Sequence, residues 1–137
     1  SPQMNFLDGT LIKKGDLYGI DLGGDVIPLP KEKTADGKLD SYVGKKIKMG
    51  IRPENLHDEE LFLQNSPDSI IDADVEVVEL MGSETYLYLK VDGKESNVVA
   101  RVDPRSTSRT GDTVKVAFET NRLHFFDKDT ELSILNR

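Results

Sequence analysis

The sequence contains no cysteine, which excludes disulfides, thiolate metal sites and a cysteine nucleophile and agrees with a cytosolic location. No stretch approaches the roughly 20 apolar residues of a membrane span, so we expect the chain not to be integral to a membrane. The opening residues, SPQMNFLDGT, have neither the basic region nor the apolar core of a signal peptide. Because Met4 is internal, we expect Ser1 to be a cut end and residues 1–137 to be one domain excised from a longer chain.

Basic residues are in the minority, with 18 Lys and Arg against 25 Asp and Glu and a net charge of −7. A protein that binds nucleic acid needs lysine and arginine to displace counterions from phosphates, and it usually carries a basic stripe. Here the two signs of charge are interspersed along the chain. Binding to nucleic acid or to an anionic membrane is therefore disfavoured.

Motifs of nucleotide chemistry are also missing. The phosphate-binding pattern GxxxxGK[ST] and the dinucleotide pattern GxGxxG do not occur, so the chain cannot bind ATP by either route. The hydroxyl groups of RSTSRTG, residues 105–111, have no base nearby in sequence that would activate a nucleophile. We predict that this chain is not itself an enzyme, with no catalytic residue and no cofactor of its own.

The two histidines give no strong metal signal. His57 precedes the acidic residues 58–60, but adjacent side chains do not converge on one ion without designed support. A solvated acidic loop is therefore the favoured interpretation, and a metal site is the alternative. His124 lies between Leu123 and Phe125 and is predicted at the surface or at the edge of the core. We predict no metal site.

Apolar and polar residues alternate along most of the chain. In DTVKVAFE, Val114, Val116 and Phe118 share one face, which is typical of a half-buried strand. The alternation slips at Val77 and Val78, which indicates a β-bulge or a strand exposed on neither face. Further strands are predicted at residues 4–12, 17–22, 45–51, 73–82, 84–91, 95–102, 122–127 and 132–135.

Turn residues separate these runs. Asp92-Gly93 predicts a hairpin with a type I′ turn, which requires positive φ at both central positions. Short helices are predicted only within residues 35–44 and after Pro53. Roughly eight to ten short strands with little helix indicate an all-β barrel or sandwich. Further turns are predicted at Asp8-Gly9, Gly15-Asp16, Gly23-Gly24, Asp36-Gly37 and Gly111-Asp112.

A local basic patch stands out in this acidic chain. Arg101, Arg105 and Arg109 surround several hydroxyl groups and main-chain donors, which together could bind an oxyanion. A solvated loop between two strands is the favoured interpretation.

Two tyrosines share one strand face. Tyr86 and Tyr88 could offer a flat surface to a partner, or they could simply cover the sheet as half-buried residues. With Lys90 they form a minimal version of a surface for single-stranded nucleic acid, which the net charge argues against.

Three runs of the sequence resemble a known family. KMGIRPENL, VEVVELMGSETYLYLKVDG and GDTVKVAFETNRLHFFDKDT, in that order and spacing, resemble the C-terminal domain of ATP-binding subunits of sugar ABC importers of the maltose and multiple-sugar type. The opening SPQMNFLDG is similar to the segment that enters this domain directly after the ATPase domain. The resemblance covers essentially the whole chain.

The resemblance implies a regulatory domain with a small β-barrel of the oligonucleotide/oligosaccharide-binding (OB) type, similar to TOBE and MOP domains, with short helical turns. In such proteins the ATPase domain of the same chain uses ATP and Mg²⁺, and the C-terminal domains of two ATPase subunits help to hold the homodimer together. The implied partners are that ATPase domain, the second subunit, the membrane permease subunits and, in some relatives, a regulatory protein. The implied location is the cytoplasmic face of the cell membrane.

The same fold has an alternative function. Related barrels bind a small oxyanion such as molybdate or sulfate between subunits, and the arginine-rich residues 101–111 would then be the site.

Arg52, Pro53 and Glu54 match the GIRPE corner of this family. Pro53 has no N–H to give to a sheet, so the preceding strand must end here. We hypothesise that this regulatory corner pins the barrel to a neighbouring loop or to a partner domain. The favoured alternative is local: Glu54 caps the following turn, and Arg52 pairs within the barrel.

The implied subunit contact is assigned to two places. Gly82, Ser83 and Glu84 form the first, where Gly82 allows a close approach or a tight turn. Phe125 and Phe126 form the second. Consecutive residues of a regular strand point to opposite faces, so one phenylalanine should be exposed and could anchor an interface.

Overall fold

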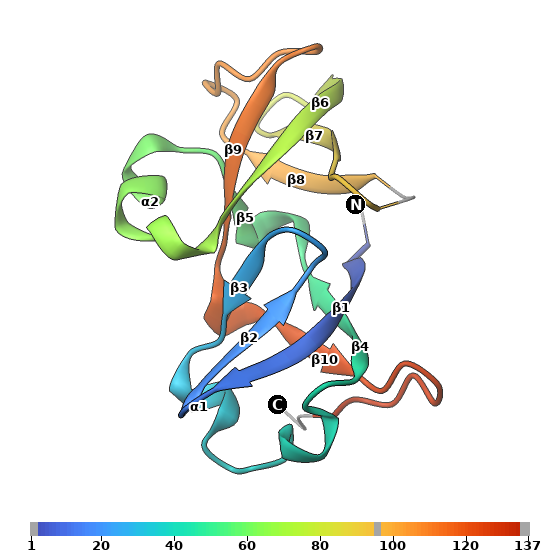
Figure 1. The fold of residues 1–137 in the computed structure, drawn as a ribbon. Coiled ribbons are helices and arrows are strands. Elements are labelled where there is room, and N and C mark those ends of the chain that lie inside the picture. The colour runs from blue at the N-terminus through green and yellow to red at the C-terminus, as the bar shows by residue number, and fades with distance from the viewer. Residues whose placement is uncertain (1–2, 95–96, 135–137) are drawn as a thin grey trace.

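The computed structural model describes residues 3–94 and 97–134. Within these ranges ten strands are joined by turns and short helical segments (Figure 1). The strands are β1 (Asn5–Lys14), β2 (Leu17–Asp21), β3 (Val26–Pro28), β4 (Lys46–Ile51), β5 (Leu56–His57), β6 (Ile70–Leu80), β7 (Thr85–Lys90), β8 (Val98–Val102), β9 (Thr113–Phe118) and β10 (His124–Phe126). The α-helices are α1 (Lys31–Thr34) and α2 (Glu60–Asn65), and the 3₁₀ turns are η1 (Asp40–Tyr42), η2 (Pro53–Asn55), η3 (Pro67–Ser69) and η4 (Thr120–Arg122).

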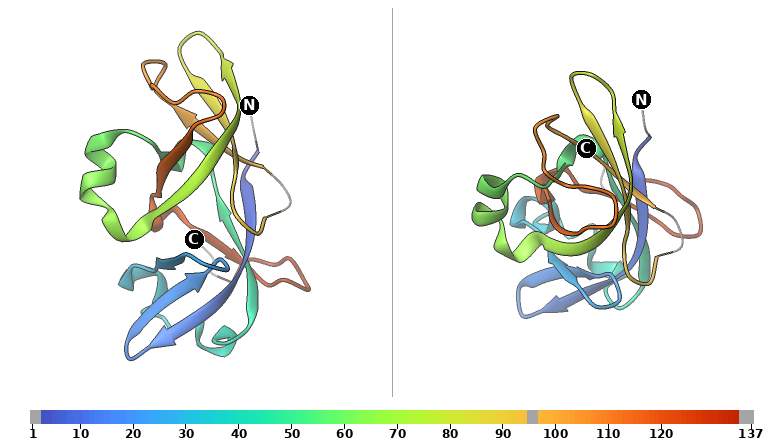
Figure 2. Two further views of the ribbon diagram at one scale, coloured as in Figure 1. Left: turned by 45° about the horizontal axis from the view of Figure 1, so that its top comes forward. Right: turned by 90° about the horizontal axis from the view of Figure 1, so that it is seen from above.

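The strands form two five-stranded antiparallel sheets. The first sheet has the order β10-β4-β1-β2-β3, and the second has the order β5-β9-β6-β7-β8. Both are strongly twisted, and their inner faces close on one another as a nearly closed barrel (Figures 1 and 2). The all-β prediction is confirmed, and so is the small OB-like barrel with short helical turns.

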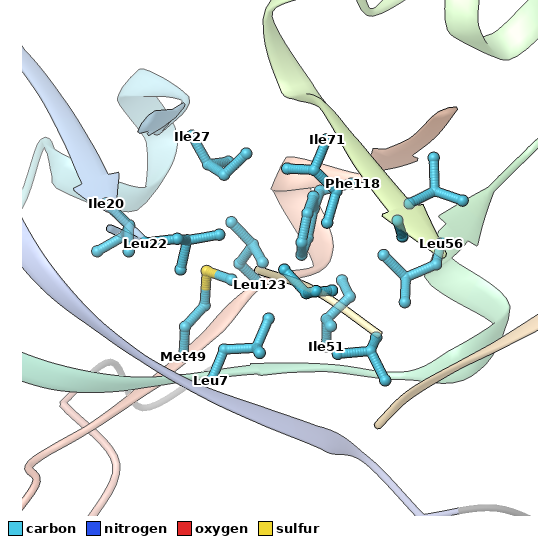
Figure 3. Close-up of a cluster of buried hydrophobic side chains, with 14 of the residues drawn as sticks. Leu7, Ile20, Leu22, Ile27, Met49, Ile51, Leu56, Ile71, Phe118 and Leu123 are labelled. Carbon is cyan, nitrogen blue, oxygen red and sulfur yellow. The ribbon is translucent and has the colours of Figure 1, made fainter. Parts of the chain in front are cut away.

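One contiguous core joins the two sheets. Its members come from alternate positions of the strands, as the period of two predicts: Leu7 and Met49 belong to the first sheet, Ile71 and Phe118 to the second, and all are almost fully buried (Figure 3). Burying one such side chain contributes about 1.5–3 kcal/mol. The apolar side chains of this core therefore join the two sheets.

Asn5 fastens the two sheets at the point where β1 begins. Its side-chain amide donates to the carbonyls of Ile51 (3.1 Å) and Val99 (2.9 Å), and its Oδ1 accepts from the Val99 N–H (2.8 Å). Asn5 is 8% exposed. β8 is the edge strand of the second sheet and has no further strand beside it. The Asn5 amide takes the place of such a strand and hydrogen-bonds both the N–H and the carbonyl of Val99.

The predicted bulge is present. The register between β6 and β7 shifts between Val75 and Val77, so Glu76 is the extra residue. The predicted turn at Asp8-Gly9 is wrong, because both residues lie inside β1. A Cβ on Gly9 would collide with the Ile20 side chain, so this glycine permits the close approach of β2 instead of a turn.

The hairpin at Asp92-Gly93 differs from its prediction. The Lys94 N–H does bond the Val91 carbonyl (3.0 Å), but of the central pair only Gly93 has positive φ, which excludes a type I′ turn. β8 resumes only at Val98. The run 95–102 is thus shorter as a strand than predicted, and its residues 95–96 lie outside the described residues.

The last predicted strand and some of the short elements also differ from the prediction. The predicted final strand, 132–135, is reduced to a single bridge between Ser133 and Phe126, with residue 135 outside the described range. The short strand β3 was not predicted; it lies at a sheet edge, where Pro28 is tolerated. The helical turn α1 was also missed. The two predicted helical regions hold η1 and η2, and α2 follows the second.

Candidate functional site

The β6–β7 hairpin ends in a tight turn. The Met81 N–H donates to the Glu84 carbonyl (2.9 Å), and Gly82 at the first central position has φ of 76°. Positive φ is a conformation that glycine adopts readily, so Gly82 suits the tight connection between the two strands. Nothing lies within 4 Å of a Cβ placed on Gly82, so this glycine serves the tight turn rather than a close approach.

Large apolar side chains are exposed on this hairpin. Val77 is 50% exposed, Leu80 74% and Met81 52%. The hairpin stands out from the body of the barrel (Figure 2). We call residues 77–84 the hairpin tip. Exposed apolar groups on a soluble protein mark interaction surfaces, and here Val77 and Leu80 lie on opposite faces of β6, so both sides of the tip have the chemistry of a contact site.

An ion pair at the base of the hairpin joins two predicted sites. Glu84 belongs to the predicted subunit contact, and Arg101 belongs to the predicted oxyanion patch. Arg101 Nε lies 3.2 Å from the Glu84 carboxylate. The two residues are linked because Arg101 on β8 is the cross-strand partner of Tyr86 on β7. Tyr86 itself is buried, so the two tyrosines do not form a flat exposed surface.

The arginine loop, residues 101–111, is bonded internally. Arg105 makes a bidentate contact with Asp103 (3.0 and 3.1 Å), and these bonds lower the pKa of Asp103 to about 2. Arg109 Nη1 donates to the carbonyls of Ser106 and Ser108 (2.9 Å each). Each of the three arginines of the predicted patch therefore has an acceptor within the chain.

The hydroxyl groups of this loop are also occupied. Ser106 and Ser108 both donate to one carboxylate oxygen of Asp58, the latter at 3.0 Å. The neighbouring pocket is lined by the carboxylates of residues 58–60 and Asp103 and by the single guanidinium of Arg105. This excess of negative charge opposes an anion.

The corner after β4 has free charged groups. Pro53 is buried and opens η2, as predicted, while Arg52 is exposed. Among the described residues, neither the Arg52 nor the Glu54 side chain makes an ion pair or a hydrogen bond, and η2 has no side-chain cap. Glu54 lies in the first turn of η2, as the local interpretation requires, but makes no cap hydrogen bond, and the predicted pair for Arg52 is not found among the described residues.

The two phenylalanines of β10 face opposite ways, as predicted. Phe125 is 1% exposed in the core, whereas Phe126 is half-buried on the outer face. Its ring meets Phe6 edge-on, with centroids 5.7 Å apart. Figure 1 places β10 far from the β6–β7 hairpin, so the two places assigned to the subunit contact do not form one surface.

His57 is not part of a solvated loop. Its ring stacks on Phe62 (3.8 Å between centroids), while its nitrogens contact Glu59 (3.1 Å) and Glu119 (2.8 Å). Within the described residues no three His, Asp or Glu side chains gather as metal ligands. His57 thus anchors α2 to the end of β9. Sequence reasoning missed this role because Glu119 is 62 residues away.

His124 lies at the edge of the core, as predicted. Burial lowers its pKa below 6.5, and the positive charges of Lys33 and Arg52 lower it further. The corner and β10 are therefore electrostatically linked.

None of the helices among the described residues has the length and apolar character that crossing a membrane requires.

Comparisons with known proteins agree with this architecture. Oligosaccharides import ATP-binding protein MsmX of Bacillus subtilis is 37% identical over 134 residues, 98% of this chain and 35% of that protein. Multiple sugar-binding transport ATP-binding protein MsmK of Streptococcus mutans is 39% identical over 134 residues, 98% of this chain and 34% of that protein. The chain thus spans about a third of the length of these relatives.

A solved structure shares the fold. The cytoplasmic molybdate-binding protein ModG, with molybdate bound, superposes with a TM-score of 0.64 over 88% of this chain and 94% of that chain. The sequence identity is 16%, so this likeness concerns the fold alone.

Family models account for most of the sequence. Residues 1–56 match the MalK OB fold domain, and residues 49–126 match the TOBE domain. Neither model describes an ATPase domain. Since the TOBE model covers more than half of the sequence, the chain belongs to the TOBE domain family.

Proposed function

We propose that the chain is a non-catalytic regulatory domain of the ATP-binding subunit of a bacterial carbohydrate ABC importer, and that it holds two such subunits together. The observation that carries the proposal is the exposed hairpin tip. Val77, Leu80 and Met81 expose half or more of their surface at the end of an ordered hairpin. Exposed apolar anchors on a rigid element suit a protein interface better than a small-molecule site.

A second copy of the domain is the proposed occupant of the tip. In a symmetric homodimer the same patch occurs on both subunits and must complement itself. The exposed apolar side chains of the tip can do so, and its two carboxylates, Glu79 and Glu84, have partners within the chain. ATP and Mg²⁺ would be bound by an ATPase domain of the same longer chain.

The corner formed by Arg52, Pro53 and Glu54 is proposed as a second contact. Its two charged side chains make no internal ion pair among the described residues, and buried Pro53 fixes the backbone between them. They are therefore available to a neighbouring domain or to a regulatory protein. In the assembled importer the domain would lie at the cytoplasmic face of the membrane, next to the permease subunits.

The test is ATP hydrolysis by the full-length subunit assembled with its permease subunits, compared with a version that lacks residues 1–137. We expect the deletion to change the rate of hydrolysis or its dependence on transported sugar, and to weaken association of the two ATP-binding subunits. Unchanged hydrolysis, regulation and association would refute the proposal.

The alternative, an oxyanion-binding module, has weaker support. ModG shares the fold, but here the arginines and serines of the arginine loop are bonded to acceptors within the chain. Thermal unfolding with added molybdate or sulfate discriminates the two functions, because a bound ligand raises the stability with its concentration.

A further inference from the structure

A pocket of about 540 Å³ lies on the outer face of the first sheet. Its floor is β1, whose alternate residues Phe6, Asp8 and Thr10 point outward, opposite to the buried Leu7. Such a volume is typical of small-molecule sites. The pocket belongs neither to the hairpin tip nor to the arginine loop.

The strand register assembles the polar wall of this pocket. Thr10 on β1 is the cross-strand partner of Asp21 on β2 and of Lys46 on β4. Side chains directly opposite one another in an antiparallel sheet lie about 5 Å apart. A carboxylate, a hydroxyl and an ammonium group therefore stand in one row across three strands.

The loop after β7 forms the opposite wall. Lys94 reaches from the second sheet to donate from Nζ to the main-chain carbonyl of Asp8 (2.6 Å). The Asp8 carboxylate accepts from Lys128 (2.8 Å), and this hydrogen bond lowers the pKa of Asp8 against the opposing effect of partial burial. Asp8 is therefore an anion that can accept further hydrogen bonds at its other oxygen.

The charges that line the pocket cancel. Asp8 and Asp21 supply two carboxylates, and Lys46 and Lys94 supply two ammonium groups. An anion would meet the carboxylates and a cation the lysines, so neither is favoured. Within the described residues the side chains of Lys46 and Thr10 make no hydrogen bond, whereas Asp21 Oδ1 accepts from the Gly23 N–H (2.8 Å) and Lys94 Nζ donates to the Asp8 carbonyl. Lys46, Thr10 and the second oxygen of Asp21 are therefore the groups that remain available.

We propose that this pocket binds a neutral saccharide. A sugar hydroxyl is both a donor and an acceptor, so neighbouring hydroxyls can donate to Asp8 and Asp21 and accept from Lys46 and Lys94. Phe6 lines the pocket and is 52% exposed, and Lys48 Nζ lies over its ring at 5.7 Å from the centroid, so a sugar ring would contact the part of Phe6 that Lys48 leaves uncovered. This site is independent of the proposed dimer contact.

The test is a titration of the isotope-labelled 137-residue chain with maltotriose, followed by amide chemical shifts. We expect saturable shifts at Thr10, Asp21 and Lys46, with a Kd on the order of 1 mM. Glycerol at the same concentration of hydroxyl groups controls for the general effect of polyols on protein surfaces.

A matched pair of variants locates the site. Lys46→Gln removes an exposed ammonium group that lines the pocket, and we expect about tenfold weaker binding. Lys45→Gln makes the same change at the neighbouring exposed lysine, which does not line the pocket, and should bind as the parent chain does. Equal affinity of both variants would overturn the proposal. So would shifts that glycerol reproduces, or saturable shifts with inorganic phosphate in place of the sugar.

Discussion

The hairpin tip and the arginine loop differ in whether their side chains are available to a partner or already bonded within the chain. Both were predicted as sites from sequence. The loop is rich in charged and hydroxyl groups, yet its arginines and serines are bonded to acceptors within the chain. The tip has two carboxylates, Glu79 and Glu84, that are paired within the chain, but its apolar residues Leu80 and Met81 are exposed.

The contrast shows that the number of polar groups is a poor guide to a binding surface. A donor that already bonds an acceptor must lose that bond before it can serve a ligand, so much of the gain is offset. An exposed apolar side chain has nothing to lose except its contact with water. The tip is therefore the stronger candidate, although the loop looks more like a site in the sequence.

The largest expected effect is on subunit association, for a substitution in the hairpin tip. We expect Leu80→Asp to weaken association of the full-length ATP-binding subunits by about thirtyfold or more, because a buried anchor of an interface contributes at least about 2 kcal/mol. Sedimentation of the full-length subunit measures the change. The melting temperature should not move, since Leu80 is 74% exposed in the chain.

Leu61→Asp is the matched control for this variant. Leu61 lies on α2 and is 72% exposed, so the change of chemistry and exposure is the same at a different place. Association should stay as it is in the parent protein. If Leu61→Asp weakened association as much as Leu80→Asp, the effect would be one of surface charge and the tip would lose its special role.

The next effect is on the stability of the arginine loop. We expect Asp58→Ala to lower the free energy of unfolding by about 1–3 kcal/mol, because the hydroxyls of Ser106 and Ser108 lose their shared acceptor. Urea unfolding followed by circular dichroism measures it. Asp68→Ala, at an exposed residue of η3, should change stability by less than about 0.5 kcal/mol. A neutral Asp58→Ala would mean that the loop is not consolidated by these bonds.

A smaller effect concerns the ion pair within the loop. Arg105→Ala should raise the pKa of Asp103 from about 2 toward its ordinary value of 3.8. Because the folded pKa is lowered, the pair stabilises the chain above pH 3.8, and that contribution is lost as the pH falls through about 2. Both groups are exposed, so little change in stability is expected. Carboxyl NMR titration is the measurement, and an unchanged pKa would contradict the bidentate pair.

The smallest expected effect is a change in the pKa of His124, which lies close to the charge of Arg52 at the corner. Arg52→Gln should raise the pKa of His124, because one of the positive charges that lower it is removed. His124 has a lowered folded pKa, so its contribution to stability is full above pH 6.5 and is lost as the pH falls through the folded pKa. Imidazole NMR titration measures the shift. Arg105→Gln, in the arginine loop, should leave His124 unchanged.

Much of the fold could be predicted because its signals are local. The alternation around Val116 and the slip near Val77 are visible in a few consecutive residues, and both recur in the structure. Gly9 and Gly93 show the limit of local signals, because both follow an aspartate but only Gly93 lies in a turn. A glycine next to an aspartate marks a turn by propensity, but Gly9 is required for the approach of β2, which no neighbouring residue reveals.

The candidate site was predicted less well. Gly82 was recognised as a tight turn, and one of the two phenylalanines of β10 was expected outside. The apolar exposure of Leu80 was not anticipated, because exposure depends on which strands cover the hairpin. The internal bonds of Ser108 were also hidden, since Asp58 is 50 residues away.

The sequence by itself determined the class of fold and the absence of nucleotide motifs, because period, turn residues and motif spacing are properties of neighbouring residues. Only the tertiary structure decided which polar groups are satisfied and which remain free. Asn5 meets Val99 across 94 residues, and Thr10, Asp21 and Lys46 form one row only when three strands pair. Such meetings follow from register and from the closing of the barrel, which the shared apolar core fixes.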